Sequence, residues 1–121
     1  MANTFKVVTF AAEPASAGTP YVMYTVASST TAVVLGLVLS KINTTAVTAE
    51  VELVSTTSSR GGANNVANGT SFLIKDVNIP TGSSLEILSG GKVVLEAGDK
   101  IQIDCSVADK LSGTLSIMEI T

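Results

Sequence analysis

Short segments in which apolar and polar residues alternate recur along the chain, and this two-residue period is the feature that most constrains its fold. The period of an amphipathic helix is almost absent. Valine, isoleucine and threonine concentrate in the alternating segments, and clusters of Gly, Ser, Thr, Asn and Pro separate them, as is typical of strands joined by turns. Nine strands are predicted, over residues 5–10, 21–27, 32–40, 46–54, 71–77, 84–88, 92–96, 100–107 and 113–120.

Strands of this number and spacing predict an all-β fold in which two antiparallel sheets form a sandwich, either Ig-like or jelly-roll-like. The 121 residues suffice for one domain with its own core. Residues 11–20 contain two prolines and many small residues, which favours an extended connection. We therefore expect residues 1–20 to form an N-terminal strand or arm with a Pro/Ala linker, and residues 21–121 to form the sandwich. Such an arm could pair with the sheet edge of another subunit.

Two segments allow their faces to be assigned. Residues 46–54 indicate a strand with one wet face, with Val47, Ala49, Val51 and Leu53 in the apolar row and Thr48, Glu50 and Glu52 in the polar row. Residues 32–40 are instead apolar on both faces, one of which carries Val34, Gly36 and Val38. Such a strand is either covered on both sides or in contact with a neighbouring subunit. Gly36 in its middle predicts a bulge or the close approach of another backbone.

Residue types that carry catalysis or bind metals are scarce. The chain contains no histidine, so it lacks the commonest general base and the commonest transition-metal ligand. Its single cysteine, Cys105, can form neither an intrachain disulfide nor a zinc site by itself, and its place in an alternating strand predicts that it is buried. The acidic residues do not follow the spacing of a calcium loop. We therefore predict no enzymatic activity, no small-molecule substrate, and no catalytic, cofactor-binding or metal-binding residue.

The segment "LEAGDKIQI", residues 95–103, contains the charge cluster that most resembles a site. It lies between two alternating strands, and Gly98 can adopt the positive φ of a tight turn while Asp99 accepts hydrogen bonds from backbone N–H groups. The pattern predicts a hairpin corner with outward charges, followed by a strand that turns Ile101, Ile103, Cys105 and Val107 inward and Gln102, Asp104, Ser106 and Ala108 outward. "SGGK", residues 89–92, is likewise predicted to be a hairpin turn.

Charge is scarce: 14% of residues are charged, 45% are hydrophobic, and the formal net charge is −3. Such a surface has little electrostatic repulsion and favours association with copies of itself or with a larger body. The basic residues lie singly along the sequence, which argues against direct binding to nucleic acid or to an anionic membrane. The N-terminal residues do not resemble a signal peptide, and the apolar run 32–39 is too short to span a bilayer, so we expect a protein that folds where it is made.

A long polar segment, residues 55–71, carries a single charge at Arg60 and a single bulky apolar residue at Val66. Long loops are usually functional or disordered. The segment is either a surface contact loop or a tolerated insertion, and the sequence leaves both interpretations open. With the N-terminal strand and the doubly apolar strand, it supplies the candidate interface residues Phe5, Val7, Val34, Val38, Arg60, Asn64 and Asn65.

Over most of residues 21–121, and most specifically in "IPTGSSLEI", the Gly-Gly-Lys turn, "LEAGD" and the terminal "MEIT", the chain resembles small β-sandwich virion proteins of tailed phages, including marine and cyanobacterial phages. This resemblance implies a non-enzymatic structural component, made in the cytoplasm of the host bacterium and located in the virion. It carries over no functional residue.

From this resemblance we expect a capsid decoration or cement protein that forms a homo-oligomer and contacts other virion proteins, such as the major capsid protein. Two alternatives stay open. One is a protein of the tail, neck or baseplate. The other is a module that binds carbohydrate on the host surface through the long polar loop.

Overall fold

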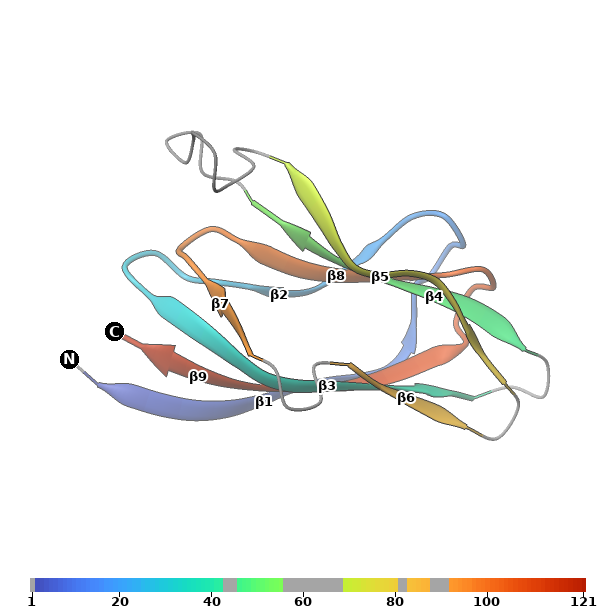
Figure 1. Cartoon of the computed structure of the whole chain (residues 1–121), viewed down its shortest axis with the longest axis horizontal. Helices are drawn as coiled ribbons and strands as arrows, with labels where there is room; N and C mark the ends of the chain where they lie inside the picture. The colour runs from blue at the N-terminus through green and yellow to red at the C-terminus, as the bar shows by residue number, and fades with distance from the viewer. Residues whose placement is uncertain (1, 43–45, 56–68, 81–82, 88–91) are drawn as a thin grey trace.

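The computed structural model describes residues 2–42, 46–55, 69–80, 83–87 and 92–121, and all regular structure in this part of the chain is β. Two antiparallel sheets pack face to face (Figure 1). The predicted β-sandwich is therefore confirmed, and each of the nine predicted strands has a counterpart. The strands are β1 (Asn3–Glu13), β2 (Tyr21–Thr25), β3 (Thr31–Lys41), β4 (Val47–Val54), β5 (Thr70–Ile79), β6 (Ser84–Ile87), β7 (Val93–Leu95), β8 (Lys100–Cys105) and β9 (Leu111–Ile120).

The strand order has the topology of a jelly roll. One sheet has the order β1-β9-β3-β6, with β7 also paired to β3, and the other has the order β2-β8-β4-β5. β6 and β7 pair with successive stretches of β3, so together they occupy one strand position. With that position counted once, the first strand, β1, pairs with the last, β9, and the second, β2, pairs with the next to last, β8. In the same nested order, β3 pairs with β6 and β7, and β4 pairs with β5. This nested pairing distinguishes a jelly roll from an Ig-like sandwich.

Both hairpins predicted in the second half of the chain are wrong. β6 and β7 pair with β3 in the same antiparallel sense and therefore run in the same direction, which a hairpin around "SGGK" would not allow. Residues 88–91 themselves lie outside the described part of the chain. β7 and β8 belong to different sheets, so the "LEAGD" corner is a crossing between sheets instead of a hairpin. Turn-forming residues indicate where the chain bends, but they do not tell which strands pair afterwards.

The core fills the space between the two sheets. Its largest fully buried side chains come from both sheets and include Leu37, Leu39, Ile79, Leu95, Ile101, Ile103, Leu111, Leu115 and Ile117. Cys105 is buried among them, as predicted. Val107 is exposed, contrary to expectation, because β8 ends at Cys105 and the alternation ends with it.

A bulge in β3 changes which residues of this strand face the core. Val34 pairs with Ile117 and Gly36 with Ser116, so Leu35 is an extra residue without its own partner on β9. Val34 and Leu37 both point into the core, although three positions separate them. The bulge predicted near Gly36 is confirmed. The alternative prediction, a close backbone approach, is not, because no atom lies within 4 Å of where a Cβ at Gly36 would be.

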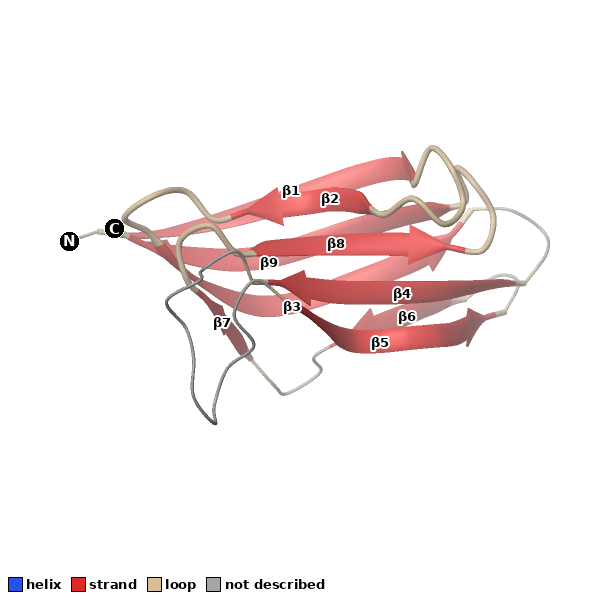
Figure 2. Ribbon diagram, turned by 90° about the horizontal axis from the view of Figure 1, so that it is seen from above, coloured by secondary structure: helices blue, strands red, loops and turns tan. Residues whose placement is uncertain are grey.

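β1 is an edge strand of the chain's own sandwich. It pairs antiparallel with β9 in an unbroken register from Asn3–Ile120 to Phe10–Gly113. Residues 3–13 of this single chain are therefore part of the sandwich instead of a separate arm. Seen from above, β1 and β2 lie along one side of the molecule and β5 lies along the other (Figure 2).

Two acidic residues expected to face solvent are buried. Glu52 on β4 is 8% exposed, and its carboxylate accepts a hydrogen bond from the side-chain amide of Gln102 on β8. Asp104 is 9% exposed, and its Oδ1 accepts hydrogen bonds from the backbone N–H of Gly18 at 3.1 Å and of Cys105 at 2.8 Å. The segment after β1 and the neighbouring strand thus cover positions that alternation alone would leave wet.

The "LEAGD" corner is held by backbone contacts as well as by its aspartate. Gly98 has φ 88°, and the Asp99 carboxylate accepts a hydrogen bond from the backbone N–H of Glu96 at 3.0 Å, as predicted. Asp99 is fully buried, however, and does not present an outward charge. Two further backbone bonds, from Gly98 N–H to the Val26 carbonyl and from Val26 N–H to the Asp99 carbonyl, attach the corner to the end of β2.

Replacing Asp99 with alanine is expected to lower the free energy of unfolding by about 1 to 2 kcal/mol, because the Glu96 N–H loses its buried acceptor. Gly98→Val should cost more, because a β-branched side chain is strained at positive φ. Urea denaturation of both variants measures the order. Gly98→Val as stable as the parent would contradict the turn geometry.

A candidate interaction surface

The outer face of the five-stranded sheet, the face turned away from the core, carries a stripe of apolar side chains between polar ones. Across it runs one continuous row, in which Phe5 pairs with Met118, Met118 with Val33, and Val33 with Val94. Phe5 is 72% exposed and Val94 is 61% exposed. Four strands thus contribute to a single apolar stripe that nothing in the chain covers among its described residues. We call this surface the outer apolar face and define it by Phe5, Val7, Val33, Leu35, Val38, Val94 and Met118.

The outer apolar face is also nearly uncharged. Among the described strand residues that the register places on it, Glu86 on β6 is the only charged one. Ser116 and Gly36 are small neighbours in the next row. A shallow hollow of about 250 Å³ lies there, and its lining residues are Phe5, Lys6, Val7, Leu35, Ser116 and Ile117. Contiguous exposed apolar surface of this kind is uncommon on a monomer and is typical of surfaces that contact another molecule.

The residues proposed from the sequence as an interface divide into three groups. Phe5, Val7 and Val38 lie on the outer apolar face, and all three are exposed. Val34 does not: it is 1% exposed and belongs to the core, so its assignment was wrong. The loop residues of the prediction, Arg60, Asn64 and Asn65, lie outside the described part of the chain.

The sequence reasoning missed four members of the face. Val33 and Leu35 were assigned to the side opposite Val38, because strict alternation does not allow for the extra residue at Leu35. Val94 was expected in a hairpin with β6, which hid its pairing to Val33. Met118 follows Thr114 and Ser116 in the row opposite the apolar Leu115 and Ile117, so the alternation of this strand could have placed it outward.

On the inner side of β1, a polar contact joins three strands. Lys6 Nζ on β1 lies 2.7 Å from Glu119 Oε1 on β9, and the hydroxyl of Tyr24 on β2 donates a hydrogen bond of 2.5 Å to Glu119 Oε2. The bond from Lys6, followed by that from Tyr24, lowers the pKa of Glu119 below its ordinary 4.5. Burial, and then the carboxylate of Glu119, raise the pKa of Tyr24 above its ordinary 10.0.

This contact predicts a dependence of stability on acid. Because folding lowers the pKa of Glu119, its contribution is complete above the ordinary pKa and is lost as the pH falls through the lower folded-state value. The Glu119→Gln variant should therefore be less stable than the parent near neutrality, by about 1 kcal/mol or less, and the difference should vanish in acid. Urea denaturation across this pH range measures it, with Glu86→Gln as the exposed control. A difference that grows in acid would contradict the assignment.

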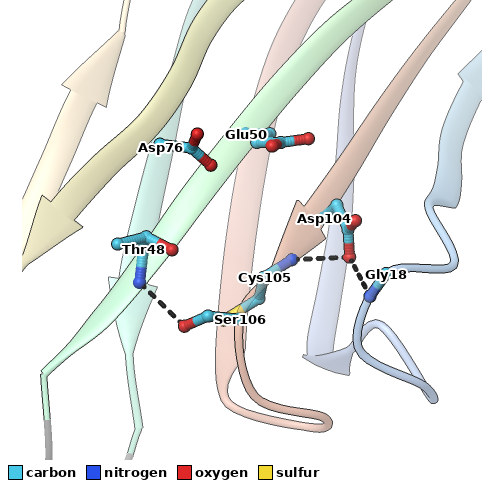
Figure 3. A pocket seen from close by; sticks show the side chains of 7 residues that line it. All are labelled: Gly18, Thr48, Glu50, Asp76, Asp104, Cys105 and Ser106. Carbon is cyan, nitrogen blue, oxygen red and sulfur yellow. Dashed lines mark hydrogen bonds between the residues drawn. The ribbon is translucent and has the colours of Figure 1, made fainter.

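A second feature is a small pocket of about 170 Å³ on the four-stranded sheet, next to the segment that follows β1 (Figure 3). Its lining includes the carboxylates of Glu50, Asp76 and Asp104. The Asp104 contacts to Gly18 and Cys105 are internal, and Ser106 Oγ accepts a hydrogen bond from the Thr48 backbone N–H at 3.0 Å.

The acidic groups of this pocket have partners within the chain. Lys75 Nζ lies 3.2 Å from Glu50 Oε1, and this bond raises the pKa of Lys75. Over the described residues, no three His, Cys, Asp or Glu side chains are placed to hold a metal ion. In the same part of the chain, no helix could cross a membrane. The outer apolar face is therefore the stronger candidate for a functional surface.

Comparisons with known proteins add one likeness. No protein-family model and no curated protein matches the chain. Among solved structures, one described as "Bacillus endospore appendages form a novel family of disulfide-linked pili" overlaps it with a TM-score of 0.49 and 18% sequence identity, over 99% of this chain and 87% of that one. At this overlap and identity, the likeness does not extend to function.

Proposed function

We propose that the protein is a non-enzymatic structural subunit that assembles with copies of itself and with a larger particle through its outer apolar face. The observation that carries this proposal is the unbroken apolar row of Phe5, Met118, Val33 and Val94 across four strands. A face four strands wide and eight residues long spans roughly 500 Å² in projection. This area is of the same order as the surface that each partner buries in a stable protein interface, about 800 Å².

Charge and rigidity support the same function. With 14% charged residues and one charged strand residue on the described outer apolar face, contact costs little desolvation of charge. Each strand of the sheet except its edges is hydrogen-bonded on both sides, so the face is held rigid and is presented without further ordering. A preformed apolar face suits permanent contact better than transient recognition.

The particle we propose is the virion of a tailed phage, with this protein as a decoration or cement subunit on the head. The support is the sequence resemblance to small β-sandwich virion proteins together with the nearly uncharged face, which fits a partner covering it permanently. The major capsid protein is the partner this position implies. A place in the tail, neck or baseplate is the competing location, and the same experiment separates the two.

The test compares two valine substitutions. Val94→Glu places a charge in the apolar row, whereas Val22→Glu makes the same change at an exposed position of β2 on the other sheet, where Val22 is 41% exposed. We expect sedimentation to show concentration-dependent oligomers for the parent and for Val22→Glu, and smaller oligomers for Val94→Glu. Particles lacking the protein should rebind the parent on their heads, as seen by electron microscopy. A parent protein that stays monomeric and binds no particle would overturn the proposal, and binding to tails would move it there.

A further inference from the structure

The four sheet edges of the sandwich differ in how well they are protected against pairing with another strand. Long, flat, apolar edges are rare on monomers because their free N–H and C=O groups recruit other strands. Among the described residues, β6 and β7 are short, with four and three residues. β2 has five residues and an irregular register between Val22 and Tyr24. β5 is longer, but its register with β4 is broken twice, and Asp76 on it has φ 52°.

Over Asn3–Phe10, before its register with β9 shifts between Phe10 and Glu13, β1 carries none of these protections. It has eleven residues, contains no proline, and keeps a regular register with β9 from Asn3 to Phe10. The charged residue in that stretch, Lys6, forms an ion pair with Glu119 of the same chain. Phe5 and Val7 beside it are exposed and apolar. Of the four edges, β1 is therefore the one built to accept another strand.

The hydrogen-bond pattern between β1 and β9 shows which backbone groups of β1 point to the free edge. Ala2 and Thr121 exchange both of their backbone hydrogen bonds, at 3.1 and 2.9 Å. In an antiparallel pair such residues alternate with residues whose groups point the opposite way. The N–H and C=O groups of Thr4, Lys6, Val8 and Phe10 are thus directed to β9, whereas those of Asn3, Phe5, Val7 and Thr9 are directed to the free edge.

We propose that β1 of one copy pairs antiparallel with β1 of a second copy, about a two-fold axis at Val7. Such an axis, perpendicular to the sheet, keeps each residue and its copy on the same face. Only an axis at Lys6 or at Val7 keeps most of the regular stretch paired. An axis at Lys6 sets two lysines directly opposite, which is unfavourable. An axis at Val7 sets Val7 opposite its copy, Phe5 opposite Thr9, and Lys6 opposite Val8.

This pairing rests on the proposed function and names its first step. The two sandwiches would share one continuous sheet, and their outer apolar faces would lie side by side on the same side of the dimer. The face available to a larger particle would double without any new surface being exposed. The edge that most invites uncontrolled pairing would be closed at the same time.

Cysteine cross-linking tests the pairing and its register. In Val7→Cys the two Cα atoms of a bonded pair would lie about 5.5 Å apart, within the range that a disulfide spans. In Phe5→Cys, and likewise in Thr9→Cys, the two introduced cysteines of a dimer would lie about 14 Å apart. In a mixed dimer of the two variants, the cysteine at position 5 of one copy would instead lie opposite the cysteine at position 9 of the other. Cys105 is buried and does not compete. We expect mild oxidation to cross-link Val7→Cys alone, and Phe5→Cys only with Thr9→Cys.

The outcomes separate this inference from the proposed function. Oligomers that Val94→Glu makes smaller, combined with equal cross-linking of all three single cysteine variants, would overturn the β1 pairing and leave the structural role standing. A monomer without register-specific cross-links would overturn both. As an independent readout, Val7→Lys should raise the dimer Kd about tenfold or more by facing two lysines across the axis, while Val22→Lys should leave it unchanged.

Discussion

Replacing Gly113 with valine is expected to lower the free energy of unfolding by about 3 kcal/mol and to loosen β1 from the sandwich. Gly113 on β9 pairs with Phe10 on β1, whose ring lies over the glycine. A Cβ at position 113 would overlap Cε1 of that ring, and it would lie 2.6 Å from Cζ of the ring and 3.2 Å from Leu39 Cδ2. The ring is itself confined, because Phe10 is 9% exposed and meets Tyr21 edge to face at 5.4 Å.

A double-mutant cycle shows whether the ring is the cause. Phe10→Ala alone should cost about 3 to 4 kcal/mol, since Phe10 is the one residue of β1 within the buried core. Combined with Gly113→Val, the total should be clearly less than the sum, because the valine then enters the space the ring has left. Urea denaturation gives the energies, and hydrogen exchange shows the loss of protection in β1. Additive losses would mean that the ring does not lie on the glycine.

Replacing Val34 with aspartate is expected to leave most molecules unfolded. Val34 is 1% exposed and pairs with the fully buried Ile117. An aspartate there must bury its carboxylate without a counter-charge or take a proton, and either costs several kcal/mol. A domain of this size has only about 5 to 15 kcal/mol of stability in total. Circular dichroism and urea denaturation measure the effect.

The matched control is the adjacent residue, Leu35. As the extra residue of the bulge it points to the outer apolar face and lines the hollow there, so Leu35→Asp should change the free energy of unfolding by about 1 kcal/mol or less. It should also weaken self-association, because it charges the proposed interface. If Val34→Asp were tolerated and Leu35→Asp unfolded the protein, the strict alternation read from the sequence would be right and the bulge misplaced.

Part of the candidate interaction surface could be predicted from the sequence because alternation is a local property. Phe5 and Val7 are apolar at alternate positions of a strand, and their exposure agrees with their selection as interface residues. For Val34 the same reasoning gives the wrong face of the strand. One extra residue inverts the inward and outward positions beyond it, and the hydrophobicity of an all-apolar strand cannot reveal where that inversion occurs.

The sequence by itself determined the all-β class, the positions of the nine strands, the burial of Cys105 and the glycine turn at Gly98. Each depends on local backbone preferences or on a period of two residues. Only the tertiary structure decided that β6 and β7 share β3, that the "LEAGD" corner joins two sheets, and that β1 is left as the unprotected edge. The physical reason is that strand order follows from pairing between distant segments, and backbone N–H and C=O groups are the same in every strand, so they carry no record of which partner they will meet.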